Sequence, residues 1–74
     1  MWKDVIIDGY WAQGKVYDEP SIHGINNGRV SKLCICAGSK FDHRAEVYAY
    51  DRGLGFDRAP DGLVDKVIER LCHP

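Results

Sequence analysis

The sequence predicts an α+β domain: an antiparallel four-stranded sheet with one C-terminal helix packed on one face, in the order β-β-β-β-α. Three observations predict this fold. Four segments within the first 51 residues are rich in β-forming residues, and turn residues separate them. The segment that follows carries apolar residues at helical spacing. The 74 residues suit one domain, residues 1–74, with a thin core.

The first two strands are predicted at 2–7 and 10–17. Asp8-Gly9 between them indicates a tight hairpin, because type I′ turns need positive φ at both central residues. Alternation assigns Trp11 and Tyr17 to one face and Gly14 to the other. A glycine inside a strand indicates a bulge or a close approach of another element.

A loop of about eleven residues follows, from Asp18 to Gly28, and it shows neither helical nor strand periodicity. Most connections in compact domains have about four to six residues, and longer ordered loops are often functional. Asn27-Gly28 at its end is interpreted as a second tight turn into the next strand.

The third and fourth strands are predicted at 29–37 and 44–51. In the third strand, Leu33 and Ile35 share the expected core face. In the fourth, small residues are expected beneath the helix, and larger ones on the uncovered face. The first set is Ala45, Val47 and Ala49, and the second is Glu46, Tyr48 and Tyr50.

The helix is predicted from Asp57, as N-cap, to about Cys72, after a glycine-broken turn at 52–56. Pro60 suits its first turn. Apolar residues four apart form a stripe, expected to pack on the core face of the sheet. The predicted contacts join Leu63, Val67 and Leu71 to Leu33, Ile35 and Val47.

Ten basic and eleven acidic residues give a formal net charge of −1. This balance disfavours a dedicated nucleic-acid binder and an acidic DNA mimic, unless the charges segregate by face. No apolar run is long enough to span a bilayer, and the first residues lack the apolar core of a signal peptide. We therefore expect a cytoplasmic protein with no membrane contact.

Three cysteines, an odd number, favour reduced thiols over a disulfide framework. Cys34-x-Cys36 and Cys72-His73 contain the residue types of a zinc site but not the usual C-x2-C spacing. His23 and His43 have no recognisable nucleophile beside them. No glycine-rich phosphate-loop motif is present. The sequence therefore predicts a protein that is not an enzyme and holds no metal or cofactor.

If the alternation holds, Trp11, Tyr17, Tyr48 and Tyr50 gather on the uncovered face of the sheet. An aromatic and charged sheet face can bind a protein partner or single-stranded nucleic acid. The alternative is that these rings cover one another in a second small cluster.

We predict that partner contacts come from the long loop and the end of the fourth strand. The candidate residues are Tyr17, Asp18, Glu19, His23, Asn26, Asn27, Arg29, Tyr50, Asp51 and Arg52. Arginine is enriched at interface hot spots because its planar fork donates several hydrogen bonds. Two structural alternatives stay open. Asp51 and Arg52 could form a local ion pair, or Asp18, Arg29 and Arg52 could pair to fix the loop.

The run KVYDEPSIHGINNGRVSKL at 15–33, followed by YDRG at 50–53, resembles a family of small uncharacterised phage and prophage proteins. Trp2 also matches the family pattern, whereas Leu54 stands where the family often has an aromatic residue. No catalytic residue can be transferred, because the family has no known function.

The resemblance implies a small phage or mobile-element protein acting inside a bacterial host cell. It implies a host protein, or a protein–nucleic acid complex, as the partner. The leading hypothesis is an inhibitor of a bacterial defence system, anti-CRISPR-like, that acts by protein–protein contact. The alternative is a small nucleic-acid-binding accessory protein. A homodimer stays open.

Overall fold

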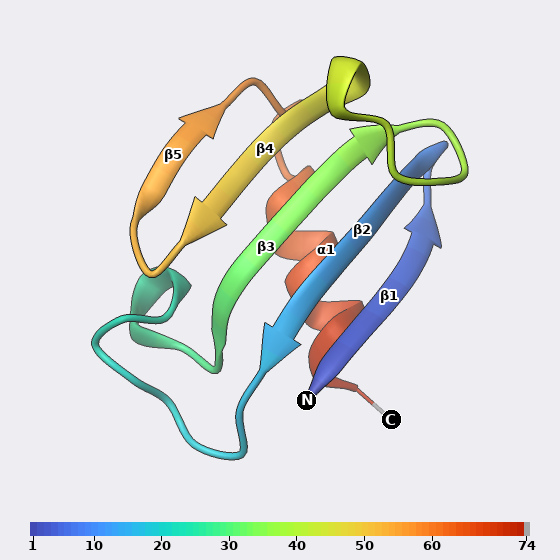
Figure 1. Ribbon diagram of the computed structural model, residues 1–74. Coiled ribbons are helices and arrows are strands. Elements are labelled where there is room, and N and C mark those ends of the chain that lie inside the picture. Colours follow the sequence, from blue (N-terminus) through green and yellow to red (C-terminus); the bar gives the residue numbers. More distant parts are fainter. Residues whose placement is uncertain (74) are drawn as a thin grey trace.

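The computed structural model describes residues 1–73. Its sheet has five antiparallel strands in the spatial order of the sequence, followed by one helix (Figure 1). The strands are β1 (Trp2–Ile7), β2 (Tyr10–Val16), β3 (Val30–Ala37), β4 (Glu46–Asp51) and β5 (Leu54–Asp57). The helix is α1 (Leu63–Cys72), and short 3-10 turns lie at η1 (Ile25–Asn27) and η2 (His43–Ala45). The predicted class and the C-terminal placement of one helix are thus confirmed, with one more strand than expected.

The first hairpin forms as the sequence predicts. Asp8 and Gly9 have φ of 53° and 81°, the left-handed values that a type I′ turn requires. Val5 of β1 lies opposite Ala12 of β2, and Ala12 in turn lies opposite Ile35 of β3. Opposite residues share a face, so this row lies on the same side of the sheet.

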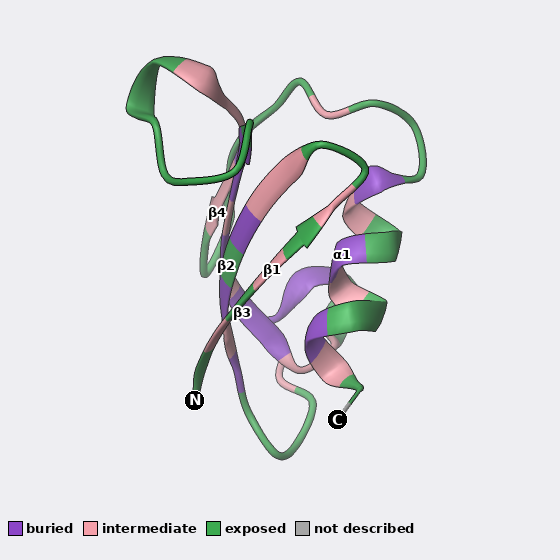
Figure 2. Cartoon of the chain, turned by 90° about the vertical axis from the view of Figure 1, so that its right-hand side faces the viewer, coloured by how far each residue is buried: buried purple, intermediate pink, exposed green. Residues whose placement is uncertain are grey.

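Helix α1 covers one face of the sheet, and the segment between β3 and β4 projects from the other (Figure 2). Leu63, Val67 and Leu71 are all buried, as the apolar stripe predicts. They join one core cluster with residues of β2, β3 and β4, against which Val47 is partly buried. The predicted helix–sheet packing is therefore confirmed.

Gly14 lies directly beneath Leu71 of the helix. A Cβ built at Gly14 would lie 2.8 Å from a terminal carbon of Leu71 and 3.1 Å from the Lys32 carbonyl oxygen. Real Cβ atoms do not make contacts as short as the first of these. Of the two roles expected for this glycine, close approach of another element is the one observed.

The fifth strand, β5, was predicted as a turn. Its four residues include Gly55, and they are exposed, so neither alternation nor hydrophobicity distinguishes them. They extend because β4 offers a free edge, with Tyr48 opposite Asp57 and Ala49 opposite Phe56. Its shortness limits the edge that it offers to further strand pairing.

The helix begins at Leu63, so the predicted start at Asp57 is wrong. Asp57 belongs to β5, and its carboxylate accepts a hydrogen bond from the Ala59 backbone N–H at 3.0 Å. Asp57 therefore caps a local turn rather than the helix. Gly62 occupies the N-cap with a left-handed φ of 83°, which favours glycine.

The predicted faces of the fourth strand are also wrong for its tyrosines. Tyr48 lies opposite Ile35 and Tyr50 opposite Leu33, so both tyrosines share the helix-covered face. The register shifts between Ile35 and Cys36, which leaves Val47 between two paired residues. One extra residue reverses the alternation along the strand. The strand also begins at Glu46 because 43–45 forms η2.

No helix within residues 1–73 combines the length and apolar character needed to cross a bilayer.

Candidate functional site

The long loop after β2 has a defined shape. Backbone hydrogen bonds of 3.0 Å join Ser21 N–H to the Gly28 carbonyl and Gly24 N–H to the Ser21 carbonyl. Ile25 is buried and anchors η1 to the core. Asn26 and Asn27 both have left-handed φ, a conformation that asparagine tolerates better than most residues. The predicted tight turn at Asn27-Gly28 is thus part of this 3-10 turn.

Three further hydrogen bonds fasten this region to the sheet. Arg29 donates through Nε to the Tyr17 carbonyl at 2.8 Å, and the Tyr50 hydroxyl donates to the His23 carbonyl at 3.0 Å. The Arg52 backbone N–H donates to the Ser31 carbonyl at 2.8 Å. The loop, the start of β3 and the β4–β5 turn are therefore held together.

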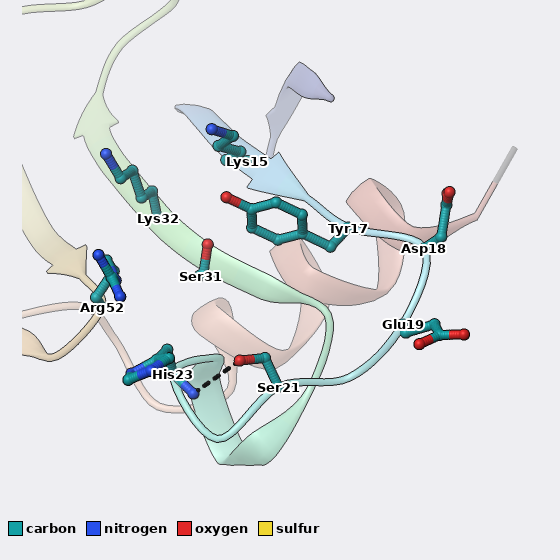
Figure 3. A pocket seen from close by; sticks show the side chains of 9 residues that line it. All are labelled: Lys15, Tyr17, Asp18, Glu19, Ser21, His23, Ser31, Lys32 and Arg52. Carbon is teal, nitrogen blue, oxygen red and sulfur yellow. Dashed lines mark hydrogen bonds between the residues drawn. The ribbon is translucent and has the colours of Figure 1, made fainter.

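Between them lies an open hollow of about 780 Å³, which we call the loop hollow (Figure 3). It is bordered by the end of β2, the loop, the start of β3 and the β4–β5 turn. Its lining residues are Lys15, Tyr17, Asp18, Glu19, Ser21, His23, Ser31, Lys32 and Arg52.

Opposite charges occupy different parts of the loop hollow. Lys15, Lys32 and Arg52 project from one side, whereas Asp18 and Glu19 lie on the loop at the other (Figure 3). The register places Lys15 directly opposite Lys32, and Lys32 opposite Asp51. This local separation fulfils the condition under which a nearly neutral chain can still present a charged surface.

The Lys15 ammonium lies close to two aromatic rings. Its Nζ is 5.4 Å from the centre of the Tyr17 ring and 6.0 Å from that of Trp2, within cation–π range. The same ammonium lowers the pKa of the Tyr17 phenol below its usual value, a hydrogen bond from the Ser31 hydroxyl lowers it further, and the charge of Lys32 makes a smaller contribution. The basic side of the hollow therefore stabilises negative charge.

Ser31 contributes a buried hydroxyl to the same hollow. Ser31 is 4% exposed, and among residues 1–73 its hydroxyl has no hydrogen-bond partner other than the neighbouring Tyr17 phenol, to whose ionised form it can donate. Buried polar atoms in folded proteins are usually paired. Lys15 of β2 pairs with Lys32 of β3, but the next residue, Val16, pairs with Val30. Ser31 is therefore left without a partner at this shift in register. Alternation alone could not have placed it here.

The structure brings together only part of the predicted site. Five of the ten candidates line the hollow: Tyr17, Asp18, Glu19, His23 and Arg52. Arg29 and Tyr50 fasten the loop, and Asp51 pairs with Lys32 at 3.7 Å. Asn26 and Asn27 are exposed on η1 and do not line the hollow. Within residues 1–73, neither Asp18 nor Arg52 forms a salt bridge, so both internal-pairing alternatives are wrong.

The prediction omitted four lining residues: Lys15, Ser21, Ser31 and Lys32. The sequence carried a signal for the two lysines: Lys15 alternates in phase with Trp11 and Tyr17, and Lys32 alternates out of phase with the core residues Leu33 and Ile35. It carried none for Ser31, whose position depends on the irregular register.

The uncovered face also exposes apolar side chains. The register places Trp2, Ile6 and Phe56 there, and they are 53%, 58% and 36% exposed. Trp11 is half-buried because Phe41 packs on it edge-to-face, with ring centres 6.0 Å apart. The expected aromatic face thus exists, but with Trp2 and Phe56 in place of Tyr48 and Tyr50.

A second polar cluster lies on this face between β3 and β4. The Cys34 thiol donates to the Glu46 carboxylate at 3.0 Å and lies 3.8 Å from the Cys36 sulfur. The other Glu46 oxygen lies 3.1 Å from His43 Nδ1. Burial, and then the hydrogen bond to Glu46, raise the pKa of the Cys34 thiol. All three cysteines are free, and no metal-holding group of His, Cys, Asp or Glu is found within residues 1–73.

This raised pKa predicts slow alkylation of Cys34 at neutral pH, because the thiolate is the reactive form. Glu46→Gln should speed its reaction with iodoacetamide, since the neutral amide no longer disfavours the thiolate. Mass spectrometry of labelled peptides measures both rates, with Glu69→Gln on the helix as the control. Equal rates in the Glu46→Gln variant and the wild type would show that Glu46 does not affect the thiol.

Fold and hollow together define a small antiparallel α+β domain with one helix-covered face and one open face. The chain belongs to the DUF7678 family, a domain of unknown function, whose model matches residues 1–74. No curated protein and no solved structure matches the chain.

Proposed function

We propose that this chain is a non-enzymatic binding protein that contacts a partner protein through the loop hollow and the adjoining open face. The observation that carries the proposal is a long loop held by hydrogen bonds around a hollow of about 780 Å³. Exposed Trp2 lies beside Lys15 of the hollow, and Ile6 and Phe56 are exposed farther along the same face of the sheet. Aromatic side chains with a polar surround are typical of protein interfaces.

We further propose that the partner is a host protein, alone or with nucleic acid, inside a bacterial cell. This finer proposal depends on the resemblance to phage and prophage proteins. In that setting, a small protein with a binding surface suits inhibition of a defence system, in the manner of an anti-CRISPR. Its test is phage plating on bacteria that carry an active defence system, with and without expression of the chain.

Charge reversal tests the surface itself. A partner captured from the bacterial host and then purified should bind Glu19→Lys and Arg52→Glu at least tenfold more weakly, a loss of about 1.4 kcal/mol. Both side chains line the hollow, are exposed and form no salt bridge within residues 1–73. Calorimetric titration measures the affinity.

Circular dichroism should show both variants folded, because neither residue contributes to the core. Arg70→Glu, on the exposed side of the helix, is the matched control and should bind as the wild type does. If both hollow variants fold and bind normally, the contact surface lies elsewhere, and the acidic helix edge at Asp61, Asp65 and Glu69 becomes the next candidate.

The second candidate function is binding of single-stranded nucleic acid. The observation that favours it is the group Lys15, Lys32 and Arg52 beside Trp2 and Tyr17. Phosphate contacts release counterions, so such binding weakens steeply as salt increases. Oligonucleotide titrations at several salt concentrations separate it from the protein-binding proposal.

A further inference from the structure

The basic side of the loop hollow brings like charges together without matching acids. Lys15 and Lys32 are directly opposed on β2 and β3, an arrangement that costs stability unless something compensates. The nearest carboxylate, Asp51, lies 3.7 Å from Lys32 and is exposed, and such surface pairs contribute little. Arg52 adds a third cation from the β4–β5 turn (Figure 3).

The Ser31 hydroxyl is a possible hydrogen-bond donor on the basic side of the loop hollow. The buried Ser31 hydroxyl lines the hollow, and within residues 1–73 the one acceptor available to it is the ionised oxygen of Tyr17. The exposed Tyr17 side chain stands beside it (Figure 3). Exposed side chains change rotamer within nanoseconds, so Tyr17 can turn and give a ligand access to the hydroxyl. Three cations and a hydroxyl that is left without an acceptor when Tyr17 turns away together match an oxyanion.

The lowered pKa of Tyr17 also indicates that this side of the hollow favours an anion. The Lys15 ammonium, and then a hydrogen bond from Ser31, lower the pKa of this phenol, which means that the site favours a negatively charged oxygen over a neutral one. A ligand oxygen at the same place would experience the same charges.

The far side of the hollow limits the size of the anion. Asp18 and Glu19 lie on the loop across from the three cations (Figure 3). A strand of successive phosphates crossing the hollow would approach both carboxylates and be repelled. A single terminal group, held on the basic side, avoids them.

We propose that the loop hollow is a binding site for one phosphate monoester group, held by Lys15, Lys32 and Arg52 with a hydrogen bond from Ser31. A dianionic group with three terminal oxygens uses this set of donors more fully than a carboxylate does. The inference rests on the proposed function, because the phosphate would be carried by a protein partner or by a small molecule that occupies the same surface.

Amide NMR shifts measured with inorganic phosphate, phosphoserine and adenosine monophosphate test the site. We expect saturable shifts at Lys15, Ser31, Lys32 and Arg52 with all three probes. Serine, and chloride at equal ionic strength, should produce none. A phosphopeptide that binds more tightly than all three identifies a protein side chain as the source, and adenosine monophosphate as the tightest ligand identifies a small molecule.

Variants separate this site from general attraction of anions. Lys15→Gln and Arg52→Gln should each weaken phosphoserine binding at least tenfold, Ser31→Ala should weaken it to a smaller extent, and Arg70→Gln should not change it. Absence of localised shifts, or equal losses with Arg70→Gln, overturns the inference. An oligonucleotide that binds more tightly than every monoester also overturns it, in favour of nucleic acid.

The two proposals fail separately. Phosphoserine binding that Arg52→Gln abolishes, together with partner capture that Arg52→Glu leaves intact, supports the phosphate site and contradicts the proposed function. Loss of partner capture in Arg52→Glu without phosphate shifts in the wild type supports the proposed function and overturns the phosphate site.

Discussion

Leu71→Ala is expected to lower the free energy of unfolding by about 2–5 kcal/mol, the usual range for a buried leucine replaced by alanine. Leu71 is fully buried and packs against the backbone of β2, with a terminal carbon near Gly14. Removing it leaves a cavity between helix and sheet that the rigid strands cannot fill. A small domain has little stability to spare, so this loss should bring it near unfolding. Urea denaturation followed by circular dichroism measures it.

Two comparisons show whether the cause is helix packing. Arg70→Ala, one residue earlier and exposed, should change the free energy of unfolding by less than about 0.5 kcal/mol. Gly14→Ala should destabilise the wild type but cost less in the Leu71→Ala background, because its Cβ then no longer meets Leu71. A Leu71→Ala variant that unfolds like the wild type would mean that the helix packs through another face.

The core was predictable because its signals are local and periodic. Leu63, Val67 and Leu71 repeat at helical spacing, and Asp8-Gly9 meets the φ requirement of its turn within two residues. The face assignment in β4 failed because nothing in the sequence marks the irregular register at Val47. A single unpaired residue exchanged the faces of Tyr48 and Ala49, although the strand was predicted with its correct end at Asp51.

The candidate site was predictable as a region but not as a set of side chains. The length of the loop and its lack of periodicity indicated 18–29, and Arg52 was chosen because a planar cation suits interfaces. Lys15, Ser31 and Lys32 approach this loop through strand pairing between positions far apart in the sequence. Such pairing requires the register, which the sequence pattern did not provide.

Gly24→Ala should disrupt the loop hollow itself. A Cβ at Gly24 would overlap the carbonyl oxygen of Gly28, which is backbone and cannot move aside as a side-chain tip can. The Gly24 φ of −80° is ordinary, so the requirement for glycine comes from this close approach and not from backbone conformation. The close approach of Gly24 to Gly28 also places the Gly28 carbonyl oxygen where it accepts a hydrogen bond from Ser21 N–H. The missing side chain of Gly24 therefore lets the loop close on itself.

Overpacking of this kind costs about 1–3 kcal/mol, and here it should also open the loop. Thermal denaturation measures the cost, and amide exchange at Ser21 and Gly28 reports the lost closure. Gly53→Ala is the matched control, since a Cβ there meets nothing within 4 Å. It should melt close to the wild type. If Gly24→Ala and Gly53→Ala show the same stability and the same amide protection, the closed loop does not depend on this glycine contact. If Gly24→Ala alone loses protection and also loses partner binding, the shape of the loop is what the partner recognises.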